Sequence, residues 1–153
     1  MYSPFFNIAL VISFTAWVAA QLLKMLGGYA HERRWDWRFF IRSGGMPSAH
    51  TALVTSLATT VGFLGGFNST LFGVAVVFAL IVMYDAAGVR RAVGIQAEIL
   101  NRILRELKGR RPKDVEHDVR ELLGHTPVQV FSGAAVGIAV AVIGLLIAGD
   151  LHL

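Results

Sequence analysis

The sequence predicts an all-α integral membrane protein, a helical bundle of four transmembrane helices with an amphipathic helix on its cytoplasmic side. Three observations predict this fold class. The 153 residues are 55% hydrophobic and only 16% charged, which is too apolar for a soluble domain. The hydrophobic residues are gathered in four runs, each close to the ~20 residues that cross a bilayer. With four spans, all 14 lysines and arginines fall on one side of the membrane.

The four predicted spans belong to a single domain, residues 1–153. They cover residues 5–26, 48–66, 69–88 and 126–149. Only Gly65-Gly66-Phe67-Asn68, a stretch rich in turn formers, separates the second span from the third, so these two are predicted to form an antiparallel hairpin. The first span is expected to be retained and not cleaved as a signal peptide, because no basic residue precedes it.

The amphipathic helix is predicted between the third and fourth spans. Its apolar residues repeat every four positions, at Ile95, Ile99, Ile103 and Leu107. The charged segments 28–45 and 90–124 lie on the same side of the membrane. The positive-inside rule places that side in the cytoplasm and both termini on the opposite side. We expect the protein in a bacterial inner membrane.

The remaining composition excludes several classes of function. The chain contains no cysteine, so disulfides, thiolate nucleophiles and cysteine-ligated metals are excluded. The net charge of +4 fits membrane topology and contact with anionic lipid headgroups. No basic-aromatic module indicates nucleic-acid binding.

Two predicted helix starts carry the residues best suited to chemistry. The second span opens with Gly45-Met46-Pro47-Ser48-Ala49-His50, and the fourth opens with Gly124-His125-Thr126-Pro127. Helix N-termini offer free backbone N–H groups and the positive end of the helix dipole, which suit a phosphate. On this interpretation two histidines and several arginines surround a phosphate at the membrane surface. The alternative is that Ser48 and Thr126 are only N-caps.

Asp85 lies near the end of the third span, inside an otherwise apolar run. A carboxylate at that depth is costly, which predicts a partner. Asp85 would orient an arginine or a histidine, with Arg90 and Arg91 close by in the sequence, or it would bind a metal. The alternative is a structural ion pair near the interface.

The fourth span contains Gly133-x-x-x-Gly137. This spacing of small residues lets membrane helices approach each other closely. It predicts tight packing of the fourth span against a neighbouring helix.

These motifs resemble those of the type 2 phosphatidic acid phosphatases, which are related to vanadium haloperoxidases. Pro47-Ser48-Ala49-His50 is similar to the family's Pro-Ser-Gly-His motif. The family's last motif is His-x-x-x-Asp-x-x-x-Gly, often with a further glycine four residues later. Its spacing is kept here by His125, Gln129, Gly133 and Gly137. The whole chain, including residues 84–91 and 123–127, looks like the short, divergent branch of that family.

The resemblance implies a lipid phosphatase that needs no metal and no other cofactor. It would hydrolyse a lipid phosphomonoester or diphosphate, such as phosphatidic acid, phosphatidylglycerophosphate or a polyprenyl phosphate. His125 would be the nucleophile that becomes a phosphohistidine, and His50 the general acid. The phosphate-binding residues would be drawn from Lys24, Arg42, Gly45, Ser48, Arg90 and Arg91. Phosphoryl transfer depends mainly on positioning and charge stabilisation, which this set supplies.

The chain departs from the family pattern in three respects. Gln129 replaces the acidic residue that orients the nucleophilic histidine, so Asp85 is a candidate substitute. The lysine of the first motif and the Ser-Arg before His125 are missing, and Val119 stands where that arginine is expected. The usual family core has six helices, so a homodimer would complete the fold.

A second function remains open on the same residues. A non-catalytic protein that binds, moves or senses anionic lipid would use arginines and helix starts equally well. Gln129 favours this alternative, because an amide cannot stabilise an imidazolium by charge. A third possibility, vanadate-dependent halogenation, suits a short membrane-embedded chain less well.

Overall fold

The computed structural model describes residues 7–32, 45–89 and 126–150, together with residues 95–96, 99 and 102–103. The elements are α1 (Ile8–Glu32), α3 (Ala49–Gly65), α4 (Thr70–Tyr84), the π-helical turn η1 (Asp85–Val89) and α7 (Pro127–Ala148). The helical fold class is confirmed, since these ranges contain no strand. Three stretches are long and apolar enough to cross a membrane, namely Ile8–Tyr29, Thr70–Gly88 and Pro127–Ala148, and α3 is a shorter apolar helix.

The predicted amphipathic helix falls mostly outside the described residues. Ile95, Ile99 and Ile103 are helical and exposed in the structure. The turns between them are not described, so the cytoplasmic amphipathic helix stays a prediction.

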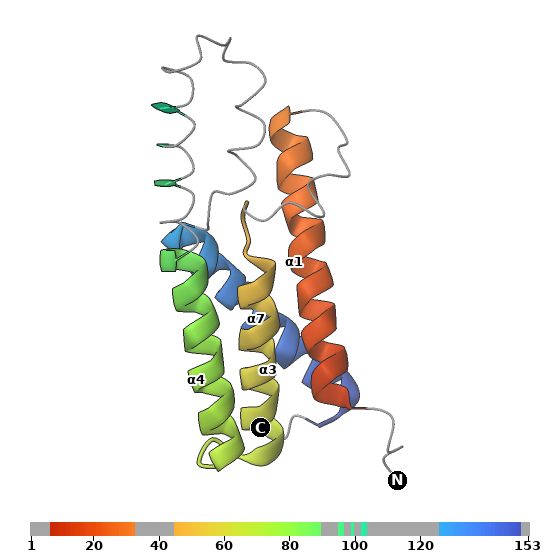
Figure 1. The fold of residues 1–153 in the computed structure, drawn as a ribbon. Helices are drawn as coiled ribbons and strands as arrows, with labels where there is room; N and C mark the ends of the chain where they lie inside the picture. Colours follow the sequence, from red (N-terminus) through yellow and green to blue (C-terminus); the bar gives the residue numbers. More distant parts are fainter. Residues whose placement is uncertain are drawn as a thin grey trace.

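Helix α3 is the centre of the bundle. It packs against α1, α4 and α7, and α1 also packs against α7. Figure 1 shows α1 and α4 on either side of α3, while α7 crosses behind it. The starts of α3 and α7 lie at the same end as the ends of α1 and α4, as four alternating spans require (Figure 1).

The predicted hairpin between α3 and α4 is confirmed. Gly66 takes a φ of +88°, which favours glycine, and Ser69 then caps α4 by accepting a hydrogen bond from the Phe72 N–H at 3.2 Å. The ring of Phe67 packs edge-on against Phe63 and Phe72, with ring centres 5.2 and 5.1 Å apart. Further along, a core of small apolar residues joins the two helices, made by Val54, Ala58, Ala75 and Ala79.

The close approach predicted from the glycine spacing occurs between α7 and α3. A Cβ added to Gly133 would overlap the carbonyl oxygen of Ser48. One added to Gly137 would overlap the carbonyl oxygen of Ala52 and the hydroxyl of Thr55. The two glycines therefore lie directly against the backbone of the segment 48–52, which is how small residues bring membrane helices together.

The interior is built from small and hydroxylated side chains, and the surface from large apolar ones. Four of the largest fully buried side chains are hydroxylated residues of α3 and its N-cap, namely Ser48, Thr51, Ser56 and Thr60. Large side chains of α4 point outward instead, including Leu71, Val74, Val77 and Ile81. This arrangement suits a bundle surrounded by lipid, where close packing and not the exclusion of water holds the helices together.

Candidate functional site

A backbone hydrogen bond holds the starts of α3 and α7 together. The Ser48 N–H donates to the carbonyl oxygen of Gln129 at 3.0 Å. Ser48 is also the N-cap of α3, and its hydroxyl oxygen accepts from the N–H and the hydroxyl of Thr51. The two helix starts that carry the histidine motifs in the sequence are therefore neighbours. Ser48 is fully buried, and its backbone N–H joins the two helices.

The start of α7 is closed by a capping box. The Thr126 hydroxyl accepts from the Gln129 N–H at 3.4 Å, and the Gln129 side-chain oxygen Oε1 accepts from the Thr126 N–H at 3.0 Å. Pro127 occupies the first turn, where it costs no hydrogen bond. The N-cap positions predicted at Ser48 and Thr126 are both confirmed. Gln129 has a local role that its place in the family motif did not suggest.

Lys24 brings α1 to this end of the bundle. The lysine is only 6% exposed, and its aliphatic carbons pass beside Gly45. A Cβ at Gly45 would lie 3.2 Å from Lys24 Cγ and 3.3 Å from Cδ. Gly45 has a φ of +86°, so glycine suits both the conformation and the contact. An ionisable side chain buried in a membrane helix is a functional-site candidate, and this one adjoins the segment leading into α3.

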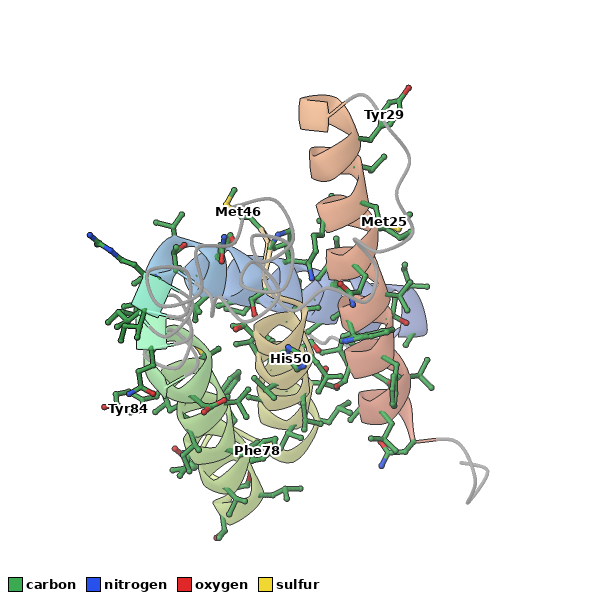
Figure 2. The ribbon with its side chains drawn as sticks, turned by 45° about the horizontal axis from the view of Figure 1, so that its top comes forward. Met25, Tyr29, Met46, His50, Phe78 and Tyr84 are labelled. Atoms are coloured by element: carbon green, nitrogen blue, oxygen red, sulfur yellow. The ribbon has the colours of Figure 1, made fainter. Side chains whose placement is uncertain are left out.

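His50 lies on a different face of α3 from the residues that touch α7. Successive helical residues turn by about 100°, so His50 projects from the side roughly opposite Ser48 and Thr55. Its side chain is exposed, on the near side of α3 between α1 and α4 (Figure 2). Side chains of a helix tilt toward its N-terminus, which directs the imidazole toward the end of the bundle where the helix starts meet.

Asp85 reaches the same end of the bundle from α4. It is the C-cap of α4 and the first residue of the π-helical turn. Its side chain is half-buried, and its N–H donates to the carbonyls of Ile81 and Val82. The turn η1 packs against α7, and Figure 1 shows it beside the start of that helix. Single π-helical turns are rare in proteins, and those that occur are often found at functional sites. The sequence did not predict this turn.

Four residues predicted for the site lie outside the described ranges, namely Arg42, Arg90, Arg91 and His125. The structure brings Lys24 against Gly45 and joins Ser48 to Gln129. It places His50 and Asp85 at the same end of the bundle, on other faces. In the sequence His125 directly precedes the Thr126 cap.

Comparison with known proteins shows the family of this chain. A model of the divergent PAP2 family matches residues 5–140. The chain is 36% identical over 147 residues to the uncharacterized membrane protein YuiD of Bacillus subtilis (strain 168), an alignment that covers 90% of this chain and 93% of the relative. No solved structure gives a significant match.

Proposed function

Because the chain belongs to the divergent PAP2 family, we propose that it hydrolyses the phosphate group of a membrane lipid through a phosphohistidine on His125. The 3.0 Å hydrogen bond from Ser48 to Gln129 carries the proposal. It fixes the N-termini of α3 and α7 side by side. In the sequence His50 is the second residue of α3, and His125 lies two residues before the first residue of α7. A phosphate lying there would meet the positive ends of both helix dipoles.

The proposed reaction has two steps. An imidazole nitrogen of His125 attacks phosphorus, and the bond from phosphorus to the lipid oxygen breaks. His50, as imidazolium, gives its proton to that leaving oxygen, so the lipid departs as an alcohol or a shorter phosphate. Water then attacks the phosphohistidine, releases inorganic phosphate and returns the proton to His50.

Charge stabilisation in this proposal comes from several elements. Lys24 and the backbone around Gly45 supply the α1 side of the phosphate site. Arg42, Arg90 and Arg91 are proposed to complete it from the adjoining basic segments. The proposed site faces the cytoplasm, because those segments hold most of the chain's basic residues. Phosphoryl transfer needs this kind of electrostatic cradle more than any further reactive group.

A second candidate function has its own supporting observation. The Oε1 atom of Gln129 accepts the Thr126 N–H and so serves the helix cap, where the related phosphatases have an acid that orients the nucleophile. A protein that binds anionic lipid without cleaving it needs no such acid. Asp85, half-buried at the end of α4, is the carboxylate proposed to replace it in the hydrolase.

The decisive experiment measures phosphate release by the purified protein in lipid nanodiscs. The panel holds phosphatidic acid, phosphatidylglycerophosphate, a polyprenyl phosphate and a polyprenyl diphosphate, with a chelator present. We expect release from at least one lipid, its abolition in His125→Ala and a fall of about 10²-fold or more in His50→Ala. His152→Ala at the tail is the matched control and should keep full activity. Retained lipid binding without release from any lipid would favour the binding protein.

A further inference from the structure

An apolar groove runs along α3 between α1 and α4. It has a volume of about 490 Å³. Its walls include Leu10 of α1, Leu57, Val61 and Leu64 of α3, and Val74 and Phe78 of α4. Asn7 also lines the groove, and its side-chain oxygen already accepts hydrogen bonds from the Ala9 and Leu10 N–H groups. The groove therefore offers hydrocarbon surface to whatever fills it.

This groove continues the face of α3 that carries His50. Leu57, Val61 and Leu64 follow His50 by seven, eleven and fourteen residues, each close to a whole number of 3.6-residue turns. All four side chains therefore project in nearly the same direction. Figure 2 shows His50 on the near side of α3, with Phe78 of α4 below it on that side. The lining of the groove thus begins at Leu57, about two helical turns beyond His50 on the same side of α3.

The dimensions of this side of α3 match an amphiphilic molecule. The fourteen residues from His50 to Leu64 rise about 21 Å at 1.5 Å per residue. The His50 end lies at the level where α3 begins, and the apolar end stops at the α3–α4 turn, where Gly65 lines the groove. A polar headgroup at one end and a single hydrocarbon chain along the rest would satisfy both environments.

We propose that the groove holds one hydrocarbon chain of the lipid whose phosphate lies at His50, an inference that rests on the proposed function. Lipid tails are as apolar as the groove, so the chain gains little from leaving the bilayer. The groove acts by orientation, because a chain held along α3 fixes the phosphoester relative to His50. Small errors in the position of the phosphoester lower the rate of phosphoryl transfer steeply. A substrate with a chain too short to enter the groove loses this alignment.

Two tryptophan variants of α4 test the inference on activity. Val74 lines the groove, whereas Ile81, on the same helix, does not, and each is 61% exposed. We expect Val74→Trp to lower kcat/KM about tenfold for dipalmitoyl phosphatidic acid and less than about twofold for the dihexanoyl compound. Ile81→Trp should match wild type on both. Equal effects of Val74→Trp on the two chain lengths, or equal effects of the two variants, would overturn the proposal.

A cross-linking experiment tests the groove without relying on hydrolysis. Phosphatidic acid and phosphatidylcholine, each with a diazirine near the end of one chain, are photolysed in nanodiscs holding the protein. We expect phosphatidic acid to label residues 57–64 and 71–78 several-fold more than phosphatidylcholine does, and Val74→Trp to remove the excess. Equal labelling by both lipids would show that any membrane lipid fills the groove. Selective labelling without phosphate release would support the lipid-binding groove and refute the hydrolase. Phosphate release that does not depend on chain length would support the hydrolase and refute the role of the groove.

Discussion

Ser48 and Gln129 share a backbone hydrogen bond of 3.0 Å that ties the N-terminal end of α3 to that of α7. The same carbonyl of Gln129 accepts from the Ser132 hydroxyl at 3.0 Å. Just beyond, the Ser48 carbonyl lies against Gly133. This contact is made by backbone groups and small residues, so added bulk will disturb it more readily than a change of polarity.

Replacing Gly133 by alanine should destabilise the protein, because the new Cβ would overlap the Ser48 carbonyl oxygen. We expect Gly133→Ala to lower the free energy of unfolding by about 1–3 kcal/mol, measured as a fall in the thermal unfolding temperature in detergent. Gly73→Ala on α4 is the control, because a Cβ there meets nothing within 4 Å. Equal unfolding temperatures for the two variants would contradict the close approach of α3 and α7.

Gln129 should tolerate glutamate but not alanine. A glutamate carboxylate can accept the Thr126 N–H as the amide does, and its charge suits a helix N-terminus. Gln129→Ala loses the side-chain half of the capping box and should cost about 0.5–2 kcal/mol of stability. Thermal unfolding checks both variants.

The pH profile of phosphate release separates this capping role from an orienting one. If Gln129 only caps α7, then Gln129→Glu keeps the wild-type profile. A more active Gln129→Glu enzyme with a profile moved to higher pH would mean that the new carboxylate stabilises an imidazolium. That outcome would contradict a purely capping role.

Lys24 should contribute charge and packing that two substitutions can separate. Lys24→Met keeps a long apolar side chain to lie against Gly45 and removes the charge. We expect it to unfold at the wild-type temperature and to bind phosphatidic acid about tenfold more weakly, the typical value of a charge-assisted hydrogen bond. Lys24→Ala should also lose stability. Binding is measured by energy transfer to a fluorescent lipid, and unchanged affinity in Lys24→Met would remove Lys24 from the site.

Phe67 should stabilise the α3–α4 hairpin. Its ring makes edge-on contacts with Phe63 and Phe72, and each such pair contributes about 0.5–1.5 kcal/mol beyond its buried area. Phe67→Ala should therefore lower the thermal unfolding temperature. Phe131→Ala, at an exposed position of α7, is the matched control. A hairpin held by its backbone alone would leave both variants equally stable.

Much of the fold follows from hydrophobic run length. The four predicted spans agree with the observed helices to within a few residues at most ends, because an apolar run of that length has few alternatives to a helix in a membrane. The first helix is the exception. It continues to Glu32, beyond the predicted end at residue 26, since a helix can extend past the apolar run that anchors it. Gly133 and Gly137 also behaved as their spacing predicts.

The site was less predictable, because its contacts join segments distant in the sequence. Nothing near Lys24 indicates that it would lie against Gly45. Gln129 was interpreted through its place in a family motif, although Thr126-Pro127-Val128-Gln129 also matches the local pattern of a capping box. That pattern was the available signal for its observed role. The π-helical turn at Asp85 has no comparable signature in the residues.

The composition of α3 has a consequence for how the chain enters the membrane. Its 17 residues span about 25 Å, less than the ~30 Å hydrocarbon core, and its hydroxyls are buried only because other helices surround them. Alone in the bilayer, α3 would be a poor substrate for the insertion machinery. The strongly apolar α4 follows after a turn of a few residues, so we expect the two to partition into lipid together. Insertion of α3 into the membrane would then have to wait until α4 has been synthesised.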